Sequence, residues 1–246
     1  MTARGMTALG MAATAVAGWA APSLLRARLL RGAVSPQVAG NGKPGNVALT
    51  FDDGPDPEGT PRVLDALDRL GWTATFFMLG MQVQQYPEVA TSVVAAGHEV
   101  AVHGFTHRNH LTRGPGEVCR DVVCAAELIT EVTGAHPAWF RPPYGVLTLG
   151  SLAAARQAGL RPVLWTAWGR DWVASTPAKV AGIVGRQLRP GGTVLLHDSD
   201  CTARVVHSWQ ATVGALPRLA ELTDRLGCTV GPLRDHLPGG PGDQAG

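Results

Sequence analysis

Short apolar runs alternate with longer amphipathic segments through most of the chain. Apolar runs of about four to eight residues bounded by turn residues are typical of buried strands, whereas apolar positions spaced by three and four indicate helices. The expected strands are 47–51, 73–79, 99–103, 136–140, 162–167, 193–197 and 228–231, and the expected helices are 60–71, 89–97, 178–188 and 209–226. This alternation predicts an α/β domain with a mainly parallel sheet, either open or closed into a barrel.

Two Thr-Pro pairs mark the expected helix starts. Thr60-Pro61 and Thr176-Pro177 each offer a capping hydroxyl followed by proline at the first helical position. Gly71 follows the first of these helices, where glycine commonly ends a helix.

The two ends of the chain differ from its middle in composition. Residues 1–25 contain an uncharged, alanine-rich and glycine-rich stretch from Met6 to Leu25, which favours a signal-like or membrane-anchor segment. Residues 26–45 have the glycine, proline and serine content of a linker, and residues 237–246 are an expected flexible tail. The folded domain is therefore expected over residues 46–236.

The composition of all 246 residues narrows the class of protein. Hydrophobic residues make up 45% and charged residues 16%, which indicates one compact domain. The net charge is only +2 and no long basic run is present, so we expect no nucleic-acid partner. Cys119 and Cys124 would point in different directions on one helix, so no bridge is expected between them, while other pairings among the four cysteines stay open. Nothing in the sequence fixes an oligomeric state.

Polar side chains gather where the apolar runs end. They are Asp52, Asp53, His103, His107, Arg141, Asp171, His197 and Asp198. Because the carboxyl ends of parallel strands lie at one edge of a sheet, we expect these side chains to converge on one site.

His103 and His107 have a spacing at which two imidazoles face the same way if the segment is a helical turn. With a strand-end carboxylate they would form an Asp/His/His site, which leaves a coordination position open for water, as catalytic zinc requires. Zinc is the expected ion, although cobalt or another divalent ion also suits this set. We expect His98 and His110 not to be ligands. Arg141 beside an aspartate would hold one carboxylate ionised and oriented.

Five segments, TFDDGP, HGFTH, RPPYG, GRDW and LLHD, occur in this order between about Val47 and Asp198. Together they resemble the five motifs of the polysaccharide deacetylase family of carbohydrate esterases, the NodB-homology domain. The resemblance implies a distorted (β/α) barrel with fewer than eight strands. It also implies a metal-dependent hydrolase that cleaves a non-peptide carbon–nitrogen bond to remove N-acetyl groups from a glycan containing N-acetylglucosamine, such as a cell-wall polysaccharide.

The resemblance also implies a role for each matching residue. These roles are metal binding by Asp53, His103 and His107, general base catalysis by Asp52 with Arg141 orienting it, general acid catalysis by His197 paired with Asp171, and substrate contacts by Trp172 and Leu195. Amide hydrolysis also needs a group that stabilises the tetrahedral oxyanion, and the backbone N–H of Tyr144 is our candidate. Such a glycan substrate predicts an extracytoplasmic protein, secreted or anchored through residues 6–25. Arg26, Arg28 and Arg31 instead favour a cytoplasmic domain if that stretch spans a membrane.

Two positions depart from the family pattern. Gly104 stands where the second motif usually has serine or threonine, and Trp168 stands where the fourth motif often has an acid. Two alternatives stay open: a related amidohydrolase that acts on a small non-sugar amide, and a sugar-binding protein with little turnover. Among the tryptophans only Trp172 is expected to contact sugar, because core packing is the commoner role.

Overall fold

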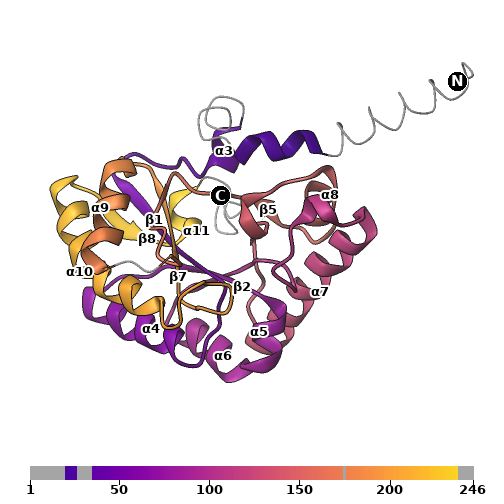
Figure 1. Cartoon of the computed structure of the whole chain (residues 1–246), viewed down its shortest axis with the longest axis horizontal. Helices are drawn as coiled ribbons and strands as arrows, with labels where there is room; N and C mark the ends of the chain where they lie inside the picture. Colours follow the sequence, from indigo (N-terminus) through magenta and orange to yellow (C-terminus); the bar gives the residue numbers. More distant parts are fainter. Residues whose placement is uncertain (1–19, 27–34, 174–175, 238–246) are drawn as a thin grey trace, which may run out of the picture.

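The computed structural model describes residues 20–26, 35–173 and 176–237 (Figure 1). Within them, eight parallel strands form one sheet. The strands are β1 (Asn46–Asp52), β2 (Thr75–Met78), β3 (Glu99–Val102), β4 (Trp139–Phe140), β5 (Arg161–Pro162), β6 (Ala167–Trp168), β7 (Thr193–His197) and β8 (Thr229–Gly231). Seven of them follow the order β5-β4-β3-β2-β1-β7-β6, and β8 pairs with β1 off this path.

β1 is the central strand of the sheet. Its residues 48–52 pair with 193–197 of β7, residues 50–52 pair with 75–77 of β2, and residues 46–48 pair with 229–231 of β8. Over the described residues no ladder joins β5 to β6, so the wall of seven strands is curled but not closed. This confirms the prediction of a distorted (β/α) barrel with fewer than eight strands in its wall.

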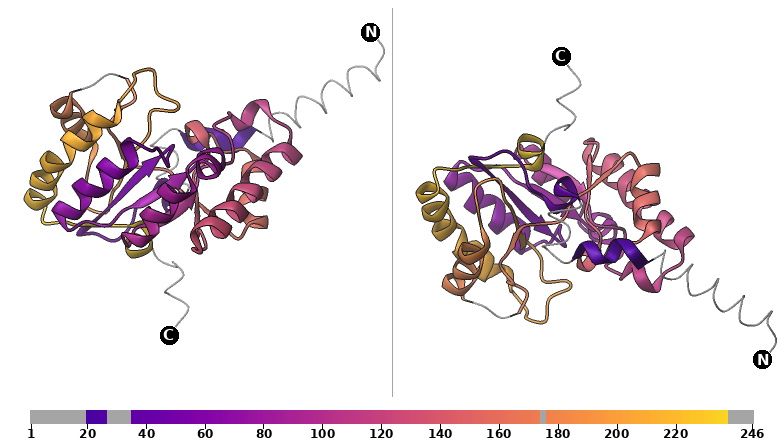
Figure 2. Two further views of the ribbon diagram at one scale, coloured as in Figure 1. Left: turned by 90° about the horizontal axis from the view of Figure 1, so that it is seen from below. Right: turned by 90° about the horizontal axis from the view of Figure 1, so that it is seen from above.

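Helices surround the sheet. They are α3 (Pro36–Ala39), α4 (Gly59–Leu70), α5 (Gly80–Gln85), α6 (Pro87–Ala95), α7 (Pro115–Thr133), α8 (Leu149–Gln157), α9 (Pro177–Gln187), α10 (Trp209–Arg225) and α11 (Leu233–His236), with 3-10 turns η1 (Ala21–Arg26), η2 (His110–Thr112) and η3 (Pro143–Gly145). α9 and α10 lie on one flank and α7 and α8 on the opposite flank in every view (Figures 1 and 2).

The alternation of side chains along β1 separates the core from the site. Val47, Leu49 and Phe51 face the helices and belong to the main hydrophobic cluster, where the Phe51 and Phe76 rings stack with centroids 5.0 Å apart. Because successive strand residues point to opposite faces, Thr50 and Asp52 point the other way, into the barrel. The strand register therefore aims Asp52 inward, toward the site described below.

The run at 162–167, predicted as one strand, is instead two short strands with a bend between them. Arg141 explains the bend, because its guanidinium donates hydrogen bonds to the carbonyls of Val163 (3.4 Å) and Leu164 (3.0 Å). Those carbonyls therefore face a side chain rather than a neighbouring strand.

One predicted helix cap is wrong and two helix-end predictions are confirmed. α4 begins at Gly59, and the Thr60 hydroxyl accepts a hydrogen bond from the Asp56 amide and donates one to Asp198. Thr176 does cap α9 by accepting from the Lys179 amide, and Gly71 ends α4 with a left-handed φ of 64°.

The division into leader, linker, domain and tail stays a prediction, and residues 1–19 lie outside the described residues. At the end of the expected linker, the Val38 carbonyl accepts from the Leu164 amide and the Gly40 carbonyl accepts from the Thr193 hydroxyl. Among residues 20–26, 35–173 and 176–237, no helix combines the length and the apolar character that crossing a membrane requires. All four cysteines are free.

Candidate active site

The two aspartates at the end of β1 turn to different partners. The Asp52 carboxylate accepts a hydrogen bond of 2.6 Å from the guanidinium of Arg141, which follows β4. Asp53 has a left-handed φ of 79°, and its Oδ1 lies 3.4 Å from Nε2 of His103 and 3.6 Å from Nε2 of His107. The strand therefore ends with one carboxylate paired to a cation and the other facing two imidazoles.

Asp53, His103 and His107 have the chemistry of a metal site. One ligand atom from each lies within 4.8 Å of the others, and in the described part of the chain this is the one group of three or more such residues. Asp53 Oδ1 is buried and has no hydrogen-bond partner among the described residues. A buried carboxylate oxygen without a donor is costly unless a cation binds it, so the residues fit a divalent ion.

Both histidines turn Nε2 toward Asp53. The His103 Nδ1–H donates to the Arg141 carbonyl at 2.8 Å, which leaves Nε2 free to face Asp53. Burial lowers the pKa of His107 to about 4, so this imidazole is neutral at neutral pH. Residues 103–107 form a non-helical loop after β3, so this loop, and not a helical turn, brings the two imidazoles to one side.

Arg141 is fully buried and satisfied. Its guanidinium also donates to the Thr50 hydroxyl at 2.9 Å and lies over the Phe77 ring, 3.9 Å from the centroid. This cage fixes the hydrogen bond to Asp52 in direction as well as in distance.

Asp171 and His197 form a second charged pair. The Asp171 carboxylate accepts from His197 Nδ1 at 3.0 Å, from the His197 amide at 2.7 Å and from the Thr212 hydroxyl at 2.6 Å. Burial alone would lower the pKa of His197, but the charge and hydrogen bond of Asp171, with smaller effects of Asp53 and Asp52, raise it to about 10. His197 Nε2 then faces Asp53 Oδ2 at 4.0 Å as a protonated donor.

A cavity of about 420 Å³ is lined by Asp52, Asp53, His103, His107 and His197, whereas Arg141 and Asp171 do not line it. Tyr144, Trp172 and Leu195, predicted as substrate contacts, all line it. The Tyr144 ring lies 4.4 Å from that of His107, and the Trp172 ring lies 5.2 Å from that of His197 between centroids. The cavity therefore combines an aromatic rim with the predicted catalytic residues.

Two tryptophans that were assigned to the core also line this cavity. Trp165 and Trp168 are 5.9 Å apart between ring centroids, and Trp168 is 5.1 Å from Trp172. Trp168 stands where the fourth motif often has an acid. At this position an aromatic ring therefore lines the cavity in place of a carboxylate. The sequence carried a signal for this wall, three tryptophans within eight residues.

The loop between β7 and α10 (residues 198–208) contributes contacts that the sequence analysis missed. The Thr202 hydroxyl donates to Asp53 Oδ2, and the Cys201 thiol contacts the Asp53 carbonyl at 3.4 Å. Thr202 and Arg204 line the same cavity. No sequence spacing marks these residues, because their partner lies about 150 positions earlier in the chain.

Comparison with known proteins identifies the family. Residues 39–163 match the family described as Polysaccharide deacetylase. The chain belongs to the polysaccharide deacetylase family. A chitooligosaccharide deacetylase from Bradyrhizobium sp. (strain ANU 289) is 39% identical over 199 residues, which covers 76% of this chain and 89% of the relative.

Two solved structures of this family resemble the chain. A peptidoglycan N-acetylglucosamine deacetylase has a TM-score of 0.76 at 27% identity and covers 84% of this chain and 95% of that chain. A CE4 family pseudoenzyme from Bacillus anthracis has a TM-score of 0.72 at 26% identity and covers 79% of this chain and 66% of that chain. Because a pseudoenzyme shares the fold, the side chains at the site must decide whether this deacetylase homologue is active.

Asp121 accounts for Gly104, the other departure from the deacetylase pattern. Gly104 has a φ of 95°, and a Cβ there would lie 2.7 Å from Asp121 Oδ2. The Asp121 carboxylate accepts from the Phe105 amide (2.9 Å) and from the Thr106 hydroxyl (2.6 Å). An acid from α7 therefore braces the histidine loop, and the glycine leaves room for it.

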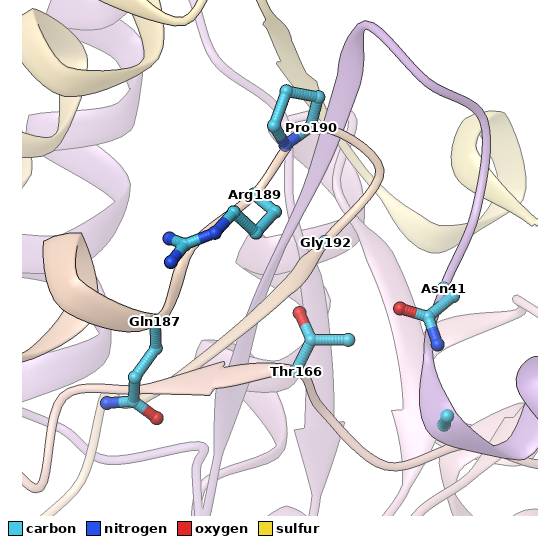
Figure 3. Close-up of a pocket in the computed structure, with 7 residues that line it drawn as sticks. Asn41, Thr166, Gln187, Arg189, Pro190 and Gly192 are labelled. Carbon is cyan, nitrogen blue, oxygen red and sulfur yellow. The ribbon is translucent and has the colours of Figure 1, made fainter. Parts of the chain in front are cut away.

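The remaining histidines and a second cavity lie apart from these residues. His98 Nδ1 accepts from the Ala74 amide, and His110 Nδ1 pairs with the Ser151 hydroxyl, so neither joins the metal group. The second cavity, of about 140 Å³, lies where β6 and β7 begin (Figure 3). Its side chains come from Asn41, Thr166, Gln187, Arg189 and Pro190, and none of the predicted site residues lines it.

Proposed function

We propose that this polysaccharide deacetylase homologue is a metal-dependent hydrolase that removes N-acetyl groups from a glycan containing N-acetylglucosamine. One observation carries the proposal: Asp53, with an unpartnered buried oxygen, faces two imidazoles. An Asp52–Arg141 pair and an Asp171–His197 pair lie beside it. The named activities of the chitooligosaccharide and peptidoglycan relatives support the substrate class.

Asp53, His103 and His107 would hold a divalent ion, with zinc the first choice and cobalt an alternative for this donor set. When bound, such an ion supplies Lewis acidity to the acetyl carbonyl and lowers the pKa of the attacking water.

The chain's own groups supply the proton transfers. Asp52 is the general base, because its carboxylate lies at the cavity and is held by Arg141 in one orientation. His197 is the general acid, since Asp171 holds its Nδ1 and keeps the ring protonated while Nε2 faces the cavity. The proton it donates goes to the sugar nitrogen as the carbon–nitrogen bond breaks.

Three further groups hold the substrate. The backbone N–H of Tyr144 would stabilise the tetrahedral oxyanion, and this role is supported by the position of Tyr144 at the cavity, where η3 turns with a φ of 60°. The Trp172 ring provides a stacking surface for the sugar, and Leu195, only 3% exposed, provides an apolar contact for the acetyl methyl group.

Acetate release from N-acetylglucosamine oligomers by the purified protein tests the proposal. We expect the metal-loaded wild type to release acetate, with each product losing the mass of an acetyl group, and Asp52→Asn to lose most of this activity. Wild-type protein that releases acetate only from small non-sugar N-acetyl amides would establish the amidohydrolase alternative. Oligomer binding without release would establish the sugar-binding alternative.

We further propose that the domain acts outside the cytoplasmic membrane, where peptidoglycan-type substrates lie. Protease added to intact cells should degrade an extracytoplasmic domain. A domain that is cleaved only after lysis would support the cytoplasmic topology that Arg26, Arg28 and Arg31 favour.

A further inference from the structure

Among the described residues, Arg204 is the one lysine or arginine that lines the cavity of the site. Its surroundings differ from those of Arg141. Arg141 is completely buried under the site, whereas Arg204 is exposed and lines the cavity itself. Among the described residues, the arginines that form salt bridges are Arg113, Arg141 and Arg225, and Arg204 is not one of them. A cation facing the substrate cavity without a protein partner is available to a substrate anion.

The loop fixes the backbone of Arg204 between two parts of the site. The Arg204 amide donates to the Trp172 carbonyl at 3.3 Å, on the side of the proposed sugar platform. Two residues earlier, the Thr202 hydroxyl donates to the Asp53 carboxylate. The loop therefore places Arg204 between Trp172, the proposed sugar platform, and Asp53, a proposed metal ligand.

The acids at the cavity do not require Arg204 as a counter-charge. Asp52 is paired with Arg141, and Asp53 faces His103 and His107 and accepts from Thr202. The charge of Arg204 is thus left for a ligand, and a guanidinium matches a carboxylate in shape and hydrogen bonding.

We infer that Arg204 binds a carboxylate that the glycan carries next to the N-acetyl group being removed. The inference rests on the proposed function and makes an acidic glycan a better substrate than a neutral N-acetylglucosamine oligomer. Two sources share this chemistry: the lactyl ether carboxylate of a muramic-type sugar, and the carboxylate of a uronic acid unit.

Matched substrates test the inference. One pair is an N-acetylglucosamine–N-acetylmuramic oligosaccharide with a free lactyl carboxylate and the same molecule with that group as a methyl amide. A second pair joins N-acetylglucosamine to a uronate and to its methyl amide. The readout is the ratio of kcat/KM values, carboxylate over amide, for acetate release. We expect wild-type ratios above one for at least one pair, and the pair with the preference identifies the source.

The variants separate charge from folding. Arg204→Gln should lower the ratio about fivefold, which is the scale of one solvent-exposed ion pair. Arg204→Lys should keep most of it. Arg170→Gln is the matched control, because Arg170 is also exposed but does not line the cavity. Its guanidinium carbon lies 5.7 Å from the centroid of the Trp168 ring. It should keep the wild-type ratio.

Salt and binding give independent measurements. Raising the ionic strength from about 0.05 M to about 0.5 M should lower the wild-type ratio, since salt screens an exposed pair. Calorimetry measures the affinity of the protein for each carboxylate substrate and for its matched amide. The ratio of these affinities should also fall in Arg204→Gln, and this measurement does not require turnover. Equal carboxylate-to-amide ratios in wild type and Arg204→Gln, in both rates and affinities, would overturn the inference. Absence of acetate release from every glycan would instead contradict the proposed function.

Discussion

Asp52 and Asp53 show how two adjacent carboxylates acquire different roles. Asp52 is the last residue of β1, so the strand register aims it into the barrel, where Arg141 donates to it at 2.6 Å. Asp53 leaves the strand with a positive φ and presents Oδ1 to two imidazole nitrogens. A salt-bridged carboxylate suits proton transfer in a fixed direction, whereas a carboxylate with one unpartnered oxygen suits a cation.

This difference predicts opposite effects of removing each carboxylate. Asp53→Ala and His107→Ala should lose the bound divalent ion, because each removes one of three ligands. Asp52→Asn should keep the ion and lower kcat by about 10²–10⁴-fold, the usual effect of removing a general base. Metal content by elemental analysis, measured beside turnover, checks both. Loss of the ion in Asp52→Asn would show that Asp52 is a ligand instead.

The Asp171–His197 pair predicts a shift in pH dependence. Its raised pKa, about 10, keeps His197 protonated over the neutral range, so the donor is lost only as pH rises through that pKa. Asp171→Asn removes the main charge that raises the pKa, and the alkaline limb of kcat/KM should move to lower pH. A cation bound at Asp53 also lowers this pKa but leaves the direction of the Asp171 effect unchanged.

Full pH profiles of wild type and Asp171→Asn measure this shift. His197→Ala is the control for loss of the proton donor and should have low activity at every pH. Because the groups of the site titrate together, the shift between variants carries the information rather than any one fitted value. An alkaline limb at the same pH in both proteins would remove Asp171 from the reaction.

At the scale of elements, the loop after β3 depends on a contact with α7. Gly104→Ala would place a Cβ 2.7 Å from Asp121 Oδ2 and strain a backbone with φ of 95°. Because Asp121 braces the loop that carries His107, we expect about 10–100-fold weaker metal binding, the usual range for lost support of a ligand. Competition with a chelator measures this affinity.

Gly97→Ala is the matched control for that variant. Gly97 has a similar φ of 83°, but nothing lies within 4 Å of a Cβ built there. Its substitution should therefore lower stability through backbone strain and leave metal affinity unchanged. Equal metal affinities in Gly104→Ala and wild type would show that the brace is not needed for binding.

The same elements show what the sequence could and could not predict. The apolar runs ending in polar residues correctly located β1, β3 and β7 and the residues that follow them. The conformation of 103–107 was not predictable from its spacing, because Gly104 and an acid 14 positions after His107 determine it. The bend in 162–167 likewise depends on Arg141, which competes for its carbonyls.

At the scale of the whole molecule, the site joins segments that are distant in the chain. The parallel order brings the ends of β1, β3, β4 and β7 to one edge of the barrel, which the motif positions allowed us to anticipate. The loop at 198–208 returns to Asp53 only because β7 pairs with β1, and after Asp198 its residues belong to none of the five motifs. Thr202 and Arg204 were therefore visible only in the folded chain.

Because the metal ligands come from two strand ends, metal binding should stabilise the whole domain. An ion that binds only the folded state adds about 2.7 kcal/mol at a free concentration 100 times its Kd. For a domain of this size, that corresponds to a Tm increase of roughly 5–10 °C over chelator-treated protein.

Asp53→Ala has lost a ligand, so its Tm should respond little to the ion or to the chelator. Asp52→Asn keeps all three ligands, and its Tm should rise as in the wild type. Thermal unfolding of the three proteins with zinc, with cobalt and with chelator measures these differences, and an equal response of Asp53→Ala and wild type would place the stabilising ion elsewhere.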